Sequence, residues 1–304
     1  MQNRHTSTAA HGQLDALAID YVQLDARKRA FDEFGYVVIE DALDAATIEE
    51  LLGAIEAIRP AMANHPHRNR GEGGLNVRPV IDKHPAFRSL LIQPTTFPTV
   101  VRLLSHYSIQ LTQSNLIEAE PSAVRRLTGW HSDGGIPAIT VNGIRAFGSL
   151  KVGYFLRDLN AADEMGALTV VPGSHRMQGG PPFPPGARDP IGATAMKVRA
   201  GSAVIFHQGI WHAAAPNRSN QTRVALYYGY GYRVFRPVDY QHMPAHVLDG
   251  ASPVERQLLG ETVTHQGYYV PTDADVPLRA WFTEHFGQAD VGELERVGDV
   301  ALDH

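Results

Sequence analysis

Short apolar runs and longer helical patterns divide the chain into a strand-rich middle and two helical ends. The strand-like runs carry many β-branched, apolar and aromatic residues and are bounded by Gly, Pro, Asn or Asp. They cover residues 36–39, 107–118, 149–156, 167–171, 195–198, 202–206 and 224–233. In the run at 107–118, alternation would place Gln113 and Asn115 on one face together with Ile109 and Leu111. The pattern therefore predicts strands throughout the middle of the chain.

Helical spacing of apolar residues marks the two ends. Asp44 is a suitable N-cap for a helix whose apolar residues recur three or four positions apart on one face. These residues are Ile48, Leu51, Leu52, Ile55 and Ile58. Further helices are expected over residues 26–34, 86–92, 99–104, 253–259 and 276–286. The chain is therefore predicted to be mainly β, with flanking helices.

The chain contains no linker, so we expect a single domain over residues 21–304, preceded by a flexible tail over residues 1–20. Residues 65–74 and 177–190 are too rich in Gly, Pro and charge for regular structure. Long loops are often functional, and we expect these two, with residues 231–245, to decide substrate specificity. A purely solvated loop is the alternative for residues 65–74.

Composition narrows the classes of function. A net charge of −5, a pI near 6.3 and the lack of a long basic run argue against nucleic acid or an anionic membrane as partner. No apolar run approaches the ~18 residues of a membrane span, and no signal peptide is visible. Cysteine is absent, which fits a reducing, cytoplasmic location and leaves His and carboxylates as the available metal ligands. Because the chain has 15 histidines, a single His carries little weight.

The segment Gly-Trp-His-Ser-Asp-Gly-Gly, residues 129–135, holds the most informative pair. His131 and Asp133 are two residues apart, so in an extended segment both side chains point to the same face. A neutral nitrogen donor beside a hard oxygen donor suits a divalent transition metal. A third ligand is needed, and His212 is the best candidate.

His212 and Arg223 lie in a segment whose pattern predicts a strand, a turn over residues 216–220 and a second strand. His212 would stand near the end of one strand and Arg223 near the start of its hairpin partner. A fixed cation would then lie close to the metal. It suits a dicarboxylate whose far carboxylate needs a bidentate partner.

The order of these four residues resembles the phytanoyl-CoA dioxygenase family of Fe(II)- and 2-oxoglutarate-dependent oxygenases. The matching features are the His131-x-Asp133 pair, the distal His212, and Arg223 eleven residues later. Residues 34–39, 166–175 and 201–223 also resemble stretches of that family. The resemblance spans about residues 30–235. It implies a double-stranded β-helix (a jelly roll, as in cupins) as the core, over about residues 107–235.

The resemblance also implies a chemistry. His131, Asp133 and His212 would bind Fe(II), and 2-oxoglutarate would chelate the metal and pair its far carboxylate with Arg223. O2 would take the last metal position, and a C–H bond would be oxidised with release of succinate and CO2. Related halogenases have a small residue in place of the carboxylate ligand, so Asp133 favours an oxygenase.

Cosubstrate contacts beyond Arg223 are less closely specified. Many relatives have a hydroxyl residue two positions after the distal His, where this chain has Ala214. Ser202 or Thr112 would then have to supply a hydroxyl to the cosubstrate. Gln113 and Asn115 lie on the strand that lines the cosubstrate pocket in the family. They are interpreted either as contacts of cosubstrate or substrate, or as core amides with satisfied hydrogen bonds.

Structural roles are the alternative for several of these residues. His131 and Asp133 could form a hydrogen-bonded structural pair, with His212 an ordinary interior histidine. The four residues in family order favour a metal site instead. His175 is assigned to a turn and His207 to a structural role.

The interpretation we favour is an Fe(II)/2-oxoglutarate-dependent dioxygenase that hydroxylates a small molecule in the biosynthesis of a specialised metabolite. Desaturation, cyclisation or epimerisation on the same scaffold remain open. Hydroxylation of a fatty acyl-CoA is also open, although no CoA-binding motif is visible. Outside this class, a cupin-like metalloenzyme without 2-oxoglutarate and a non-catalytic jelly-roll binding module remain. Arg223 argues against the first and the intact triad against the second. The sequence does not predict the oligomeric state.

Overall fold

The structure is a computed structural model of the 304-residue chain. It describes residues 14, 17–62, 74–122, 129–133, 140–141, 144–159, 165–267 and 269–287. Most of the expected tail over residues 1–20 and nearly all of the loop expected over residues 65–74 lie outside these ranges. The division into a tail and one domain over residues 21–304 stays a prediction.

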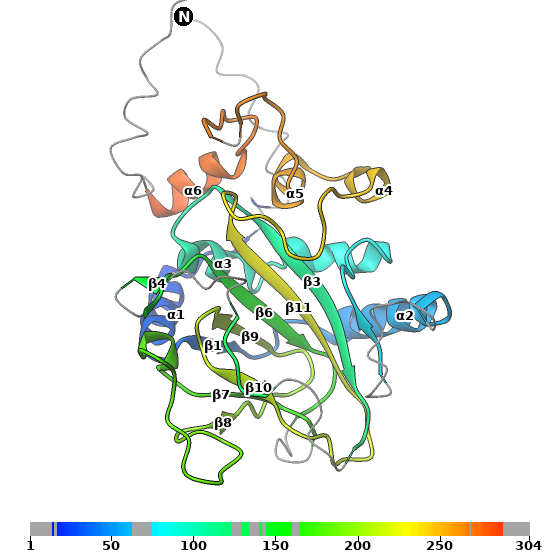
Figure 1. Ribbon diagram of the computed structural model, residues 1–304. Helices are drawn as coiled ribbons and strands as arrows, with labels where there is room; N and C mark the ends of the chain where they lie inside the picture. Colours follow the sequence, from blue (N-terminus) through cyan, green and yellow to red (C-terminus); the bar gives the residue numbers. More distant parts are fainter. Residues whose placement is uncertain are drawn as a thin grey trace, which may run out of the picture.

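Two antiparallel sheets form the centre of the molecule (Figure 1). The larger sheet has the strand order β1-β9-β6-β11-β3-β2, and the smaller has the order β10-β7-β8. The larger sheet comprises β1 (Tyr36–Ile39), β9 (Ala203–His207), β6 (Ser149–Phe155), β11 (Arg223–Tyr232), β3 (Ile109–Ala119) and β2 (Asn76–Val77). The smaller sheet comprises β10 (His212–Ala214), β7 (Leu168–Val170) and β8 (Thr194–Ala195), and β4 (Thr140–Val141) pairs with β5 (Ile144–Arg145) apart from both.

The inner face of the large sheet packs against the small sheet. Phe155, Phe206 and Tyr227 of the large sheet share one buried cluster with Leu168 and Val170 of β7. Two facing antiparallel sheets around a narrow core are the arrangement expected of a jelly roll. The predicted fold class, mainly β with a jelly-roll core and flanking helices, is confirmed.

Helices cover the outer face of the large sheet (Figure 1). This layer contains α1 (Tyr21–Phe34), α2 (Ala45–Met62), the 3-10 helix η1 (Pro85–Ile92) and α3 (Phe97–Leu104). Asp44 accepts a hydrogen bond from the backbone N–H of Thr47, the capping contact that its sequence position predicts. Three further helices gather at one end of β3 and β11: α4 (Ala245–Leu248), α5 (Pro253–Leu258) and α6 (Leu278–Phe286). None of the helices in the described ranges is long and apolar enough to cross a membrane.

Three local expectations are corrected. The helix expected over residues 86–92 is a 3-10 helix. A second, shorter 3-10 helix is η2 (Ser174–Arg176).

The expected hairpin between His212 and Arg223 does not form. β10 pairs with β7 in the small sheet, while β11 pairs with β3 and β6 in the large one. The turn at Gln208–Gly209 ends β9 and lets the chain cross to the small sheet, and the segment after β10 crosses back.

The third correction concerns β3. Its register against β11 shifts between Gly229, which pairs with Gln113, and Tyr230, which pairs with Leu111. Thr112 is the extra residue of a β-bulge, so alternation restarts there. Ile109 and Leu111 consequently belong to the core cluster under the helices, while Gln113 and Asn115 line an interior cavity. The expectation that all four share one face is wrong for this reason.

Candidate metal centre

The backbones of His131 and His212 form a bridge that brings the two imidazoles side by side. The His131 N–H donates to the His212 carbonyl at 3.1 Å, and the His212 N–H donates to the His131 carbonyl at 2.8 Å. The ring centroids are 4.2 Å apart. His131 therefore extends the small sheet beyond β10, and residues 81 positions apart in sequence become neighbours.

Each imidazole is oriented by its own chain. Nδ1 of His131 lies 3.0 Å from the Gly129 carbonyl oxygen, and Nδ1 of His212 lies 3.0 Å from the Ile210 carbonyl oxygen. A carbonyl only accepts hydrogen bonds, so Nδ1 must carry the hydrogen in both rings. Nε2 of each ring then presents a lone pair, as a metal ligand requires.

Asp133 completes the cluster. One carboxylate oxygen lies 3.9 Å from Nε2 of His131, and the other lies 3.7 Å from Nε2 of His212. The three ligand atoms all lie within 4.8 Å of one another. Two nitrogen donors and one carboxylate on one side of a cavity fit the three-ligand facial set of non-haem iron sites.

Charge at the cluster is set by Lys151, a residue of β6. Its ammonium lies 2.7 Å from Asp133. Burial raises the pKa of the Asp133 carboxyl, but Lys151 and the two imidazoles outweigh this effect and hold the pKa at about 2. Burial lowers the pKa of His212 to about 4, against a smaller opposing effect of Asp133. The carboxylate is therefore charged and His212 is neutral at physiological pH, the states in which both bind a metal.

Arg223 lies on the same cavity as the triad. The cavity, of about 270 Å³, lies between the two sheets, and its wall includes His131, Asp133, His212, Lys151 and Arg223. The Arg223 side chain is buried, and its Nη1 donates to the Gly166 carbonyl at 2.7 Å. Its buried Nε has no partner among the described residues. A buried guanidinium with unused donors fits an anionic ligand.

The other predicted cosubstrate residues divide into two groups. Gln113 and Asn115 line the cavity, and so does Ala214. Thr112 and Ser202 are buried but are not among the residues that line it. The structure therefore does not bring either hydroxyl to the cavity wall beside Arg223.

The sequence interpretation missed Lys151. The signal is a lysine in an otherwise apolar and aromatic strand, at a position that alternation places on the same face as Gly153 and Phe155. Tyr227 was also missed. Burial raises the pKa of its phenol, with Arg223 and Asp133 both close enough to act on it electrostatically. Its ring lines the cavity wall near both residues.

His207 and His175, which the sequence assigns to structural roles, both lie outside the metal-ligand cluster. His207 stacks on Phe147 with centroids 4.7 Å apart, and burial lowers its pKa to about 3. His175 lies in the short helix η2 and is hydrogen-bonded to the Asp32 carbonyl. Neither belongs to the metal-ligand cluster found among the described residues.

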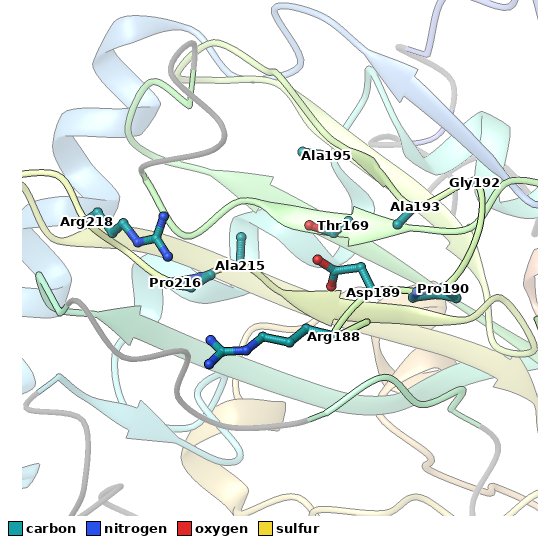
Figure 2. A pocket seen from close by; sticks show the side chains of 10 residues that line it. All are labelled: Thr169, Arg188, Asp189, Pro190, Gly192, Ala193, Ala195, Ala215, Pro216 and Arg218. Atoms are coloured by element: carbon teal, nitrogen blue, oxygen red, sulfur yellow. The ribbon is translucent and has the colours of Figure 1, made fainter. Parts of the chain in front are cut away.

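A wider cleft of about 450 Å³ lies beside the small sheet (Figure 2). Thr169 lines this cleft, while Leu168 lines the triad cavity, so the two lie on opposite faces of β7. Asp189 accepts a hydrogen bond from Nε1 of Trp130 at 2.9 Å. This bond fixes the Pro- and Gly-rich segment beside the residue that precedes His131. The described residues that line the cleft include no set of metal ligands.

A curated relative covers most of the chain. An uncharacterized protein of Mycobacterium tuberculosis is 28% identical over 267 residues, which are 82% of this chain and 93% of the relative. Two solved structures share the fold. The epimerase SnoN from nogalamycin biosynthesis, in complex with Fe3+, α-ketoglutarate and nogalamycin RO, is 21% identical. It has a TM-score of 0.56 and covers 72% of this chain and 88% of its own. EctD from S. alaskensis with 2-oxoglutarate and 5-hydroxyectoine is 22% identical, with a TM-score of 0.57, and covers 72% of this chain and 78% of its own.

The decisive comparison is with protein families. The sequence profile of the phytanoyl-CoA dioxygenase family matches residues 31–225, more than half of the chain. This range contains the bridge of His131 and His212, Asp133, Lys151 and Arg223. The chain belongs to the phytanoyl-CoA dioxygenase family of Fe(II)/2-oxoglutarate-dependent oxygenases.

Proposed function

We propose that this protein binds Fe(II) through His131, Asp133 and His212 and uses 2-oxoglutarate and O2 to oxidise an unactivated C–H bond of a small molecule. Hydroxylation is the proposed outcome, with release of succinate and CO2. The observation that carries the proposal is one cavity that holds both the three-ligand cluster and the buried Arg223.

The donor set supports iron. Both imidazoles present Nε2 towards a carboxylate that is charged, and all three ligand atoms are within reach of one ion. The structural neighbours SnoN and EctD are described with Fe3+ and α-ketoglutarate and with 2-oxoglutarate, respectively. At their low identity, these neighbours support the fold, and the donor set of this chain supports the metal.

Arg223 supports a dicarboxylate cosubstrate. It lies at the start of β11, and its register partner on β3 is Ala119. The hydrogen bond to the Gly166 carbonyl holds the guanidinium in place while Nε stays available. Gln113 and Asn115 are proposed as further contacts of cosubstrate or substrate, from the neighbouring strand β3 of the same sheet. The proposed roles of Thr112 and Ser202 are weaker, because neither lines the cavity.

The protein's own contribution is orientation and exclusion of water. When bound, the iron, 2-oxoglutarate and O2 supply the oxidising chemistry. The backbone bridge fixes the two histidines, Lys151 holds the carboxylate of Asp133, and Arg223 holds the far end of the cosubstrate. Phe206, whose ring lies 5.2 Å from that of His212, closes the apolar side of the site together with Leu168.

The substrate is proposed to be a small molecule of specialised metabolism. The solved neighbours include an epimerase and a carbocyclase of nogalamycin biosynthesis, so one fold serves several outcomes. Desaturation, cyclisation and epimerisation therefore remain alternatives to hydroxylation. The cavity of about 270 Å³ is compact, which favours a small substrate group at the metal.

Arg223→Ala tests the cosubstrate assignment. Removing the partner of a buried carboxylate costs about 3–5 kcal/mol, so the KM for 2-oxoglutarate in a succinate-release assay should rise at least about a hundredfold. The matched control is Arg218→Ala, at an exposed arginine in the cleft beside the small sheet, which should leave the KM for 2-oxoglutarate unchanged. An unchanged KM in Arg223→Ala would refute the role of Arg223.

A further inference from the structure

Lys151 introduces a cation into the metal site. Its side chain is only 16% exposed, and it points from β6 to the same inner face as Gly153 and Phe155. Its ammonium touches Asp133, which is proposed to ligate the metal. A buried lysine is rare unless it is paired, so its counter-ion must be identified.

The charged side chains of the cavity, together with a bound metal and cosubstrate, add up to one net positive charge. Among the described residues that line it away from solvent, Asp133 contributes one negative charge and Lys151 and Arg223 contribute two positive charges. Arg78 also lines the cavity, but its side chain is exposed to solvent. A divalent metal and the dianion of 2-oxoglutarate cancel each other. Once Asp133 ligates a dication, its negative charge is shared between that ion and Lys151, and one further anion restores the balance of charge.

Strand register separates Lys151 from Arg223. Lys151 pairs with Gly229 of β11, and Arg223 lies six residues earlier on that strand. Six residues of strand span roughly 20 Å, so the two side chains enter the cavity from opposite ends. Arg223 is committed to the far carboxylate of the cosubstrate. Lys151 is therefore available to a different molecule.

Gln113 and Lys151 lie on either side of Gly229, on the two strands that flank β11. Gly229 pairs with Lys151 on one side and with Gln113 on the other. Because Gly229 has no side chain, Gln113 lies over it. A Cβ on Gly229 would come within 2.6 Å of the Gln113 Cγ. The Gln113 amide has no hydrogen-bond partner among the described residues, and it lines the cavity. An ammonium and an unused amide N–H on the two strands that flank β11 form a site for a carboxylate that spans the inner face of Gly229.

We infer that the primary substrate carries a carboxylate, which Lys151 and Gln113 hold at the end of the cavity opposite Arg223. The inference rests on the proposed function and specifies its substrate as an acid. The acid group anchors the substrate, and the C–H bond to be oxidised lies further along the same molecule. Gln113 is thereby assigned to the substrate and not to the cosubstrate.

The test uses the full-length protein loaded anaerobically with Fe(II) and 2-oxoglutarate, whose visible charge-transfer band reports events near the metal. The probes are matched pairs of acids and primary amides: benzoate and benzamide, phenylacetate and phenylacetamide, hexanoate and hexanamide. Each acid should perturb the band at a concentration at least about tenfold lower than its amide, since a charge-assisted hydrogen bond distinguishes the two.

Variants of Lys151 test whether this residue causes the preference for acids over amides. Lys151→Met should abolish the preference for acids, while Lys151→Arg, which keeps the charge, should retain it. Lys197→Met, at an exposed lysine, is the matched control and should behave as the parent protein. Circular dichroism establishes that each variant is folded, and the band that each variant forms with saturating Fe(II) and 2-oxoglutarate is the baseline for its own probe titration.

Three outcomes would overturn the inference. The first is that no acid perturbs the band up to about 10 mM, a very weak interaction. The second is that Lys151→Met keeps the preference, or that it weakens Fe(II) binding alone, which would make Lys151 a residue that only positions Asp133. The third is loss of the 2-oxoglutarate band in Lys151→Met, which would assign Lys151 to the cosubstrate. If the parent protein shows no band at all, the proposed function itself fails, and this result is recognised before any probe is added.

Discussion

At the scale of single residues, the site consists of two histidines oriented by backbone carbonyls beside a charged carboxylate. The His131-x-Asp133 pair could be predicted from the sequence, because ligand type and alternation follow from covalent structure. His212, one of 15 histidines, is identified by its place in the order of the family's motifs. Lys151 could not be assigned in this way. Its partner Asp133 lies on another segment, and only the fold brings the two within 2.7 Å. The sequence offers Ser202 and Thr112 only as nearby hydroxyl groups, and the fold places neither on the cavity wall.

Buried histidines should make the metal-free protein sensitive to acid. Burial lowers the pKa of His207 to about 3 and that of His212 to about 4, while an unfolded histidine titrates near 6.5. Between these values the unfolded chain binds protons that the folded chain does not, so stability is present above about pH 6.5 and is lost as the pH falls. Between about pH 7 and pH 5, each of these two histidines should lower the free energy of unfolding by about 2 kcal/mol.

Asp239 changes the stability with pH in the opposite direction from the histidines. Burial raises its pKa to about 6, so its contribution to the free energy of unfolding is present at low pH and is lost as the pH rises through that value. It offsets about 1 kcal/mol of the loss between about pH 7 and pH 5. Urea unfolding of the metal-free protein should therefore show a net decrease on the order of 2–3 kcal/mol over that interval. In His207→Gln the decrease should be clearly smaller. Equal free energies of unfolding at the two pH values would contradict the account.

At the scale of elements, the strands followed from composition, but their partners did not. Every strand of the large sheet except β2 was predicted within a few residues, because apolar runs between turn residues determine where a strand can form. Pairing depends on contacts between distant segments. The hairpin predicted for His212 and Arg223 is therefore replaced by two strands in different sheets, and the bulge at Thr112 shifts which residues of β3 face the cavity.

Three tyrosines of β11 attach the helical layer to the large sheet. The hydroxyls of Tyr228, Tyr230 and Tyr232 donate to the carbonyls of Phe87, Leu91 and Leu104, at 2.6, 2.9 and 3.0 Å. Tyr228→Phe removes one of these bonds and should lower the free energy of unfolding by about 1 kcal/mol. It should leave Fe(II) binding unchanged, because Tyr228 faces the helices. Urea unfolding measures the effect, with Tyr21→Phe, at a half-exposed tyrosine, as control. A midpoint equal to that of the parent protein would contradict this role.

At the scale of the whole molecule, the fold explains why chemistry is confined to the space between the two sheets. The helical layer buries the outer face of the large sheet, so polar side chains on that sheet can serve a ligand only on the inner face. Lys151, Gln113, Asn115 and Arg223 all lie there, and His131 and His212 face them from the small sheet. The order of motifs along the chain predicted this architecture through family resemblance, and the family match over residues 31–225 confirms it.

The central claim is that this cavity binds Fe(II) and then 2-oxoglutarate. The most direct measurement is an anaerobic titration of the metal-free protein with Fe(II), followed by 2-oxoglutarate, monitored by visible absorption. The account predicts a weak charge-transfer band that appears only after both are added. It should be absent from His131→Ala and His212→Ala, which lack a ligand, and present in His242→Ala, at an exposed histidine outside the site. Fe(II) binding without a band would favour a cupin-like metalloenzyme, and a band that persists in His212→Ala would contradict the triad.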